Sequence, residues 1–226
     1  MRATWAFIGC AAAVALVLLL VTSNVRATSN SLWLYEQLFE RNEVPRRSGI
    51  TILELRGVGA TIQDYFNSDI EPLAVTASIN GAPVSLFGDD EAAHMADVKR
   101  LFAKTYRLQA ISALVLAIAI TAAVYLRRGQ SATMIRSWLS RGAIIAAGAI
   151  TVIGIASMVA FEQVFLLFHY IGFPDGNFTF STQTDYLVQV FPYGFWADIT
   201  VVIGAMTLTE AAVLWIAVRV ARSFWK

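Results

Sequence analysis

The chain has 226 residues, of which 57% are hydrophobic and only 15% are charged, and its formal net charge is +1. This composition is too apolar, and its charges are too unevenly distributed, for an ordinary soluble domain. The sequence has no phosphate-binding glycine loop, no dinucleotide fingerprint and no basic aromatic patch, so we expect neither nucleotide cofactors nor nucleic acid as partners. We therefore predict an integral membrane protein.

Four apolar runs are long enough to cross a bilayer as helices. Three contain no Asp, Glu, Lys or Arg, and the fourth contains only Asp198 and Glu210. Each has roughly 20 residues, or about 30 Å of helix. The runs cover residues 3–25, 108–126, 142–161 and 196–218. The sequence thus predicts an all-α membrane protein with four transmembrane helices.

The first run has an alternative interpretation as a cleaved signal peptide. Residues 25–27, Val-Arg-Ala, loosely fit a small-x-Ala cleavage site. However, the run is longer than a normal signal core, which favours a retained transmembrane helix.

The distribution of basic residues indicates the orientation in the membrane. Lys and Arg in short flanking segments favour the cytoplasmic side. The segments before the first run, between the second and third, and after the fourth hold eight basic residues and no acid. The other nine basic residues lie among eleven acids in residues 26–107. We therefore expect both termini inside the cell and residues 26–107 and 162–195 outside.

The outer segment 26–107 is long enough for a small cap but not for a large separate core. Serines within residues 29–31 are expected to cap a short helix. Thr51 and Glu54 have the spacing of a capping box, which predicts a helix to about Phe66. Residues 73–87 are rich in Val, Ile and Thr around Asn80-Gly81, a dipeptide typical of a tight hairpin. The cap should be mixed, mostly helical with one β-hairpin.

The chain has two histidines, and the first, His94, lies in the string EAAHMADVK. The preceding acids of residues 89–91 suit the start of a helix, which we expect to run with little or no break into the second apolar run. Glu91 and Asp97, three residues to either side, are then placed to orient the ring of His94. The alternative is a solvated histidine on an amphipathic face.

The second histidine, His169, lies in FEQVFLLFHYIGF, just after the third apolar run. This segment holds more aromatic residues than an interfacial belt needs. Glu162 precedes His169 by two helical turns on nearly the same face, where the two could interact if the helix bends. The alternative is an interfacial histidine among anchoring aromatic residues.

Taken together, the motifs resemble those of a known family. EAAHMADVKRLF, followed by FLLFHYIGF, TDYLVQVFP and FW, is similar to the bacterial lipoprotein intramolecular transacylases, which are four-span membrane proteins. The span count, the orientation, the outer cap and the order of the motifs agree, so the resemblance extends over most of the chain. The chain departs from the family pattern in residues 173–178, where an asparagine and a tryptophan are expected.

The resemblance implies acyl transfer within one substrate molecule. The sn-2 acyl chain of a lipoprotein's S-diacylglyceryl group moves to the α-amine of the N-terminal cysteine, which gives a lyso-form lipoprotein. Because the substrate supplies nucleophile and electrophile, the protein needs only proton handling and positioning, without a cofactor. Cys10, the only cysteine, lies near the inner side and would be a poor nucleophile for an outer-face reaction.

By the resemblance, His94 and His169 form the catalytic pair, one as base and the other as oxyanion stabiliser or acid; the residues leave open which is which. We expect both at the outer surface of a bacterial cytoplasmic membrane, at the depth of the substrate's ester carbonyls among the membrane lipids. Further side chains are expected to orient the histidines or wall the substrate pocket. They are Glu91, Asp97, Phe168, Tyr170, Phe173, Asp185, Phe191 and Trp196.

Three alternatives remain open from the residues. The histidines could ligate a haem. They could also bind zinc with Glu91, Asp97 or Asp185 in a metal-dependent hydrolase, although no characteristic zinc-ligand spacing supports this. The protein could also be a non-catalytic sensor or accessory subunit that responds to external pH.

Two features of the predicted spans concern helix packing. A carboxylate such as Glu210 within a span costs about 2.5–3.5 kcal/mol to insert, so we expect it to face other helices and find a partner. Gly142, Gly148 and Gly154 in the third run are expected to allow close helix contacts.

Overall fold

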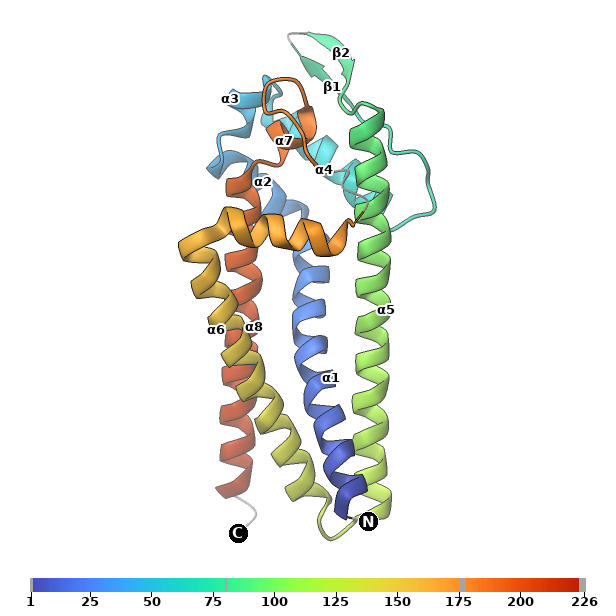
Figure 1. Ribbon diagram of the computed structural model, residues 1–226, viewed down its shortest axis with the longest axis vertical. Helices are drawn as coiled ribbons and strands as arrows, with labels where there is room; N and C mark the ends of the chain where they lie inside the picture. The colour runs from blue at the N-terminus through green and yellow to red at the C-terminus, as the bar shows by residue number, and fades with distance from the viewer. Residues whose placement is uncertain (1, 80, 175–177, 224–226) are drawn as a thin grey trace. The chain divides into compact units, whose positions relative to one another are not determined.

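The computed structural model describes residues 2–79, 81–174 and 178–223 (Figure 1). Within these residues, four helices are long and apolar enough to cross a membrane, and one two-stranded antiparallel sheet is present. This confirms the predicted fold class. The elements are α1 (Arg2–Ser29), α2 (Leu32–Arg41), α3 (Val44–Ser48), α4 (Ile52–Phe66), β1 (Thr76–Ile79), β2 (Ala82–Ser85), α5 (Asp89–Leu126), α6 (Ser131–Gly172), α7 (Tyr186–Val190) and α8 (Tyr193–Ser223).

Each predicted apolar run lies inside one long helix, α1, α5, α6 or α8, and each helix extends beyond its run. Helix α5 continues without interruption from the acidic residues 89–91 to Leu126, as predicted. Helix α6 covers the third run and also residues 162–172 of the predicted outer segment. The borders of the membrane along these helices remain predictions.

The chain divides into two compact units. The first contains residues up to 26, residues 105–155 and residues from 202 onward, so it holds most of the apolar runs. The second contains residues 27–104 and 156–201, with the cap elements and both histidines.

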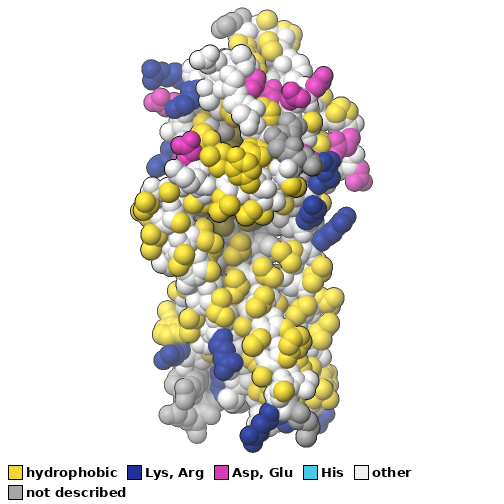
Figure 2. Space-filling view, in the orientation of Figure 1, with side chains coloured by type: hydrophobic (Ala, Val, Ile, Leu, Met, Phe, Trp, Pro, Cys, Tyr) yellow, Lys and Arg dark blue, Asp and Glu magenta, His cyan; other side chains and the backbone are white. Residues whose placement is uncertain are grey.

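Hydrophobic side chains cover the outside of the first unit. Ile111, Leu114, Ile118 and Val152 are all more than half exposed in the protein, which suits a surface that faces lipid. On the face drawn in Figure 2, yellow hydrophobic side chains cover the long helices of this unit, and blue basic side chains gather near the chain ends.

Small residues let three helices of the first unit pack around Trp138. Ala12 of α1, Ala119 and Ala123 of α5 and Trp138 of α6 form a buried cluster, and Trp5 stacks on Trp138 with ring centroids 6.4 Å apart. A Cβ at Gly9 would overlap the Trp138 ring. The indole is therefore accommodated by the absence of a side chain on the facing helix.

The three glycines of the third apolar run differ in role. A Cβ added to Gly142 would lie 2.8 Å from Leu16 Cδ2 and 3.0 Å from the Ala13 carbonyl oxygen, so this glycine does allow α6 to approach α1. A Cβ at Gly148 or Gly154 would meet nothing within 4 Å. The packing prediction is right for Gly142 and wrong for the other two, because their Cα atoms do not face a neighbouring described helix.

Glu210 finds a partner within the first unit, as predicted. The buried Asn24 of α1 donates from Nδ2 to Glu210 Oε2 over 2.8 Å and to Thr207 Oγ1 over 3.0 Å. One amide thus links α1 to two successive turns of α8, which offsets the cost of placing a carboxyl group in an apolar run.

The second unit begins with two capped helices. Ser31 accepts a hydrogen bond from the Leu34 N–H and caps α2, and Thr51 and Glu54 form the complete capping box of α4. Both caps were predicted from the sequence. Hydrogen bonds, chiefly that from the Thr51 hydroxyl, hold the pKa of Glu54 below its usual value.

The predicted β-hairpin is present and is attached to α4. Strands β1 and β2 pair from Thr76 with Ser85 to Ile79 with Ala82, and Gly81 adopts a φ of 83°, which favours glycine. Asn80 lies outside the described residues. Glu54 Oε1 accepts from the Ser78 N–H over 2.9 Å, so the same carboxylate that caps α4 also holds β1.

Aromatic side chains form the core between α2 and the start of α8. Tyr35 and Phe39 pack against Phe191 and Phe195 with ring centroids 5.5–6.3 Å apart. Beside them, Asp198 Oδ2 accepts from Arg41 Nε and Asn42 Nδ2, each over 3.0 Å. These contacts fix the start of α8 against the cap.

Helix α6 bends at Ala160, whose φ of −146° and ψ of 52° are not helical (Figure 1). The eleven residues that follow Phe161 carry His169 and pack within the second unit. The bend therefore sets the direction of the segment that brings His169 toward the first turns of α5.

Candidate active site

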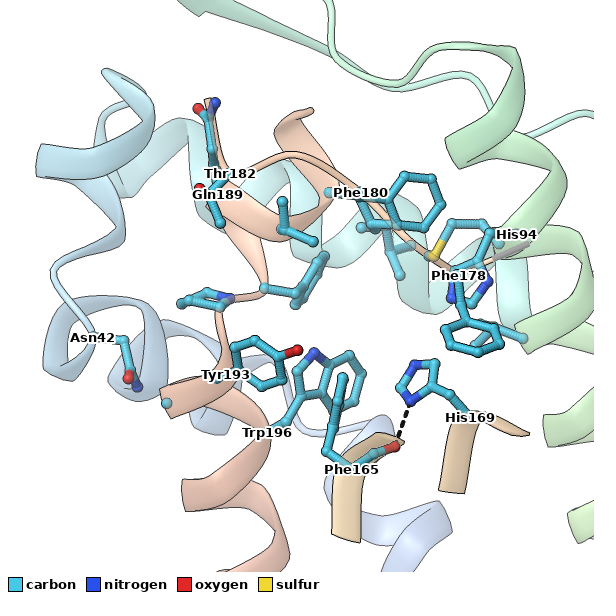
Figure 3. Close-up of a pocket in the computed structure, with 18 of the residues that line it drawn as sticks. Asn42, His94, Phe165, His169, Phe178, Phe180, Thr182, Gln189, Tyr193 and Trp196 are labelled. Atoms are coloured by element: carbon cyan, nitrogen blue, oxygen red, sulfur yellow. Dashed lines mark hydrogen bonds between the residues drawn. The ribbon is translucent and has the colours of Figure 1, made fainter. Parts of the chain in front are cut away.

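The second unit contains a cavity of about 750 Å³, a size typical of ligand sites. Segments from α2, α3, α4, α5, the end of α6, α7, the start of α8 and residues 178–182 line it (Figure 3). His94 and His169 both lie on its wall. The structure thus brings together the two residues that the sequence singled out.

The two imidazole rings face one another. Their centroids are 6.0 Å apart and their planes are 15° from parallel, and the side chains are 6% and 8% exposed. Among the described residues, no hydrogen bond joins one ring to the other. The pair is therefore sheltered from bulk water, with the ring nitrogens separate enough to act on different atoms of a ligand.

Aromatic rings enclose the pair. Phe173 contacts both histidines, with centroid distances of 4.8 Å to His94 and 5.3 Å to His169. Phe165 lies 4.1 Å from the ring of His169, and Phe180 lies 5.4 Å from that of His94. The environment is apolar, which strengthens electrostatic interactions inside it.

A backbone carbonyl sets the tautomer of His169. The Nδ1 atom lies 2.8 Å from the carbonyl oxygen of Phe165, one helical turn earlier, as the dashed line in Figure 3 marks. A carbonyl oxygen only accepts, so Nδ1 carries the proton. In the neutral ring, Nε2 is therefore the proton acceptor.

Of the five aromatic residues predicted to wall the pocket, Phe191 and Trp196 line the cavity. Phe173 is buried and packs against the histidine rings. Phe168 is 51% exposed and touches His169 edge-on, whereas Tyr170 is 65% exposed and packs on Phe178. Two of the five predicted aromatic residues thus line the cavity, and the other three do not.

The predicted acidic residues take backbone and surface partners. Glu91, which is buried, accepts from the Gly88 N–H through Oε2 over 2.8 Å and from the Leu187 N–H through Oε1 over 2.7 Å. Asp97 pairs with Arg100. Asp185 accepts from the Ser181 N–H and the Thr184 hydroxyl just before α7. Glu162 is exposed and does not line the cavity.

Lys99, five residues after His94, holds the loop that follows α4. Its Nζ donates to the Ile70 carbonyl over 2.6 Å, lies 3.5 Å from Glu71 Oε1 and stands 4.2 Å from the centre of the Tyr65 ring. Burial, and then the hydrogen bond to Glu71, raise the pKa of Tyr65 to about 12. Lys99 therefore ties α4 and its loop to α5.

The sequence profile of the family described as lipoprotein intramolecular transacylase Lit matches residues 10–196. The chain belongs to this family. It is an acyltransferase, and its family acts on lipoprotein substrates in the membrane.

Solved structures of this family have the same fold as this chain. The lipoprotein intramolecular transacylase Lit from Bacillus cereus is 15% identical, with a TM-score of 0.83 over 100% of both chains. Two variants of that protein, with a histidine replaced by alanine or by arginine, are also 15% identical. The alanine variant has a TM-score of 0.77, over 100% of this chain and 97% of that chain. The arginine variant has a TM-score of 0.75, over 96% of this chain and 92% of that chain. No curated protein matches the chain.

The transacylase has further cavity residues that sequence reasoning missed. Phe165 lies four residues before His169, and this helical spacing could have indicated a contact. Phe178 and Phe180 reach the cavity from a loop, and Tyr193 from the first turn of α8, without a local signal. Gln189 of the short α7 also lines the cavity.

Metal binding was an alternative for the two histidines. Within the part of the chain that the structure describes, no three side chains of His, Cys, Asp or Glu come together in a group that could hold a metal ion. Glu91, Asp97 and Asp185 have the other partners described above. Among the described residues that line the cavity, the side chains typical of metal ligands are therefore the two imidazoles, and no carboxylate accompanies them.

Proposed function

We propose that this membrane acyltransferase moves the sn-2 acyl chain of a lipoprotein's S-diacylglyceryl group to the α-amine of the same molecule's N-terminal cysteine. The product is an N-acyl, S-monoacylglyceryl lipoprotein. The observation that carries this proposal is the pair of buried imidazoles, 6.0 Å apart, on the wall of a cavity otherwise rich in aromatic rings.

The lining of the cavity suits a reaction in which the protein is not the nucleophile. Among the described residues, no serine or cysteine lines it, and Cys10 belongs to the other unit. The substrate's own amine attacks the substrate's own ester, so binding both in one cavity supplies proximity and orientation. The protein then has to move protons and stabilise charge.

We assign the role of general base to His169. Its Nδ1–H is held by the Phe165 carbonyl, so Nε2 of the neutral ring accepts a proton from the substrate's α-ammonium. The resulting imidazolium keeps its bond to the carbonyl. A fixed ring orientation reduces the reorganisation needed during proton transfer.

We assign His94 to the ester. Facing His169, it stabilises the oxyanion that forms when the amine adds to the carbonyl, and it supplies a proton to the departing glyceryl oxygen. The N–C bond forms, the ester C–O bond breaks and the glyceryl oxygen gains one proton. The ammonium loses two protons in all, so one is released to solvent.

The enclosing rings keep water from competing with the amine. Phe173 packs against both imidazoles, and Phe191 and Trp196 line the cavity, which makes hydrolysis of the ester less favourable than transfer. The polar candidates Glu91 and Asp185 act from behind the wall, through the backbone of the segment around α7. Phe168, Tyr170 and Asp97 are the most peripheral of the candidates.

We place both chain ends in the cytoplasm and the histidine cavity at the outer surface of the bacterial membrane. The support is the set of basic residues without acids in the three segments predicted to lie inside the cell. At the outer surface the ester carbonyls of a lipid-anchored substrate lie between hydrocarbon and headgroups. A cavity with aromatic walls and two imidazoles matches that boundary.

The test uses a synthetic diacylglyceryl lipopeptide with acyl chains of different length at sn-1 and sn-2, mixed with the protein in vesicles. Mass spectrometry of the product should find the sn-2 chain on the α-amine. His94→Ala and His169→Ala should each abolish this product, whereas Trp33→Ala, at an exposed position on α2, should not. Product that carries the sn-1 chain, or an active histidine variant, would contradict the proposed mechanism.

A further inference from the structure

The cavity has two chemically different ends. Near α4 and α5 its lining is apolar, with Ile62, Phe66, Met95, Val98 and Phe102. Toward α2, α3 and α7 the lining includes Asn42, Arg47 and Gln189. In Figure 3, Asn42, Thr182 and Gln189 lie on the side opposite the histidines, with Tyr193 and Trp196 between them.

Gln189 is a polar group available to a ligand. Its side chain is half-buried on the cavity wall, and among the described residues no hydrogen bond to its amide is present. The amide is therefore free to pair with polar groups of a ligand in the cavity, and a hydrogen bond formed there contributes to the ligand's affinity. The position of Gln189 is fixed, because Leu187 in the same helix donates its N–H to the buried Glu91.

Asn42 is a second amide at this end, and its orientation is set. Nδ2 donates to the Leu38 carbonyl and to Asp198, each over 3.0 Å, so Oδ1 remains as an acceptor. A Cβ at Gly194 would collide with Oδ1, so the glycine makes room for this oxygen at the cavity wall. Arg47 is exposed, which indicates that this end of the cavity opens to solvent.

We propose that the end of the cavity formed by Asn42, Arg47 and Gln189 binds the peptide main chain that follows the substrate's modified cysteine. This inference rests on the proposed function. A diacylglyceryl lipoprotein has two apolar arms, its acyl chains, and one polar arm, its peptide. With the reacting groups at the histidines, the acyl chains match the Phe66 and Phe102 end and the peptide matches the amide end.

Binding at this end would not depend on the peptide's sequence. Carboxamide side chains pair with main-chain N–H and C=O groups, which every residue provides except for the missing N–H of proline. One enzyme can then accept lipoproteins whose residues after the cysteine differ. Gln189 is the residue that binds the peptide main chain, because its amide has no hydrogen bond to another described residue.

The experiment measures the equilibrium affinity of the protein in nanodiscs for two ligands in which an ether replaces the sn-2 ester, so that no transfer occurs. One is S-dialkylglyceryl cysteine amide, which has no peptide, and the other carries a five-residue peptide. Gln189→Met keeps the shape of the side chain but removes the amide. It should raise the Kd of the peptide-bearing ligand about three- to tenfold and leave that of the other ligand unchanged.

Gln183→Met is the matched control, since Gln183 lies exposed in the preceding turn and does not line the cavity. It should change neither Kd. Equal effects of Gln189→Met on the two ligands, or no effect on either, would overturn the inference. Because these ligands cannot react, the result is independent of the transfer assay, whose failure would speak against the proposed function alone.

Discussion

His169 Nδ1 donates to the carbonyl oxygen of Phe165 over 2.8 Å, while the ring faces His94 at a centroid distance of 6.0 Å. The helix that carries His169 thus fixes one of its nitrogens and leaves the other for the substrate. Asparagine in place of His169 can still donate to that carbonyl but has no equivalent of Nε2. His169→Asn should therefore fold normally and lose transfer activity by a factor of about 10²–10⁴, the usual contribution of a general base.

The rate of acyl transfer and the thermal unfolding temperature together test this prediction. An Asn variant that keeps more than about a tenth of the activity would remove His169 from the base role, since that residual rate exceeds what loss of a base allows.

Glu91 should act as a positioning residue through the backbone of α7. Glu91→Gln replaces one carboxylate oxygen by an NH₂ group, which cannot accept from either the Gly88 or the Leu187 N–H. We expect a loss of about 1–3 kcal/mol in unfolding free energy and faster hydrogen exchange in residues 186–190. Asp89→Asn, an exposed change in the same first turn, is the control and should do neither. Unchanged exchange in Glu91→Gln would mean that α7 is held by other contacts.

The attachment of the hairpin should depend on pH through Glu54. Its pKa lies below the ordinary value of 4.5, mainly because of the hydrogen bond from Thr51. A depressed pKa contributes stability that is present above pH 4.5 and is lost as pH falls through the lower, folded-state value. Hydrogen exchange in residues 76–79 and 82–85, measured relative to the intrinsic exchange rate at each pH, should therefore accelerate below pH 4.5. In Glu54→Gln it should already be fast at neutral pH, and a variant that stays protected would refute the link.

Tyr65 should remain protonated to unusually high pH. Burial, followed by the hydrogen bond to Glu71, raises its pKa from 10 to about 12. The contribution of the raised pKa to the free energy of unfolding is fully present below pH 10 and is lost as the pH rises through about 12. An ultraviolet titration should show a late tyrosine transition that Tyr65→Phe removes and Glu71→Gln moves to lower pH. A titration of Tyr65→Phe identical to that of the unchanged protein would contradict this assignment.

Gly142 and Gly148 provide a matched test of helix packing in the first unit. A side chain at Gly142 would press on Leu16 and on the Ala13 carbonyl, whereas one at Gly148 would meet nothing within 4 Å. Gly142→Val should cost about 1–3 kcal/mol through overpacking, and Gly148→Val should cost much less. Thermal unfolding in one detergent measures both. Equal effects would show that Gly142 does not set the distance between α1 and α6.

Local spacing and composition determined most of the secondary structure. The four apolar runs, the capping box of Thr51 and Glu54, the hairpin around Gly81 and the uninterrupted start of α5 were all predicted correctly. These features depend on residues a few positions apart, so a linear pattern contains them. The two histidines also stood out in the sequence, and the motif resemblance pointed to the family that the profile match then showed.

The tertiary structure decided what surrounds those histidines. The bend at Ala160 turns the end of α6, the loop of residues 178–182 supplies Phe178 and Phe180, and the Glu91 carboxylate reaches across the chain to Leu187. Asp97, which was predicted to orient His94, instead forms an ion pair with Arg100 one helical turn later. Contacts between distant segments depend on how the backbone bends and which loops cover it, and no helical or strand periodicity encodes either.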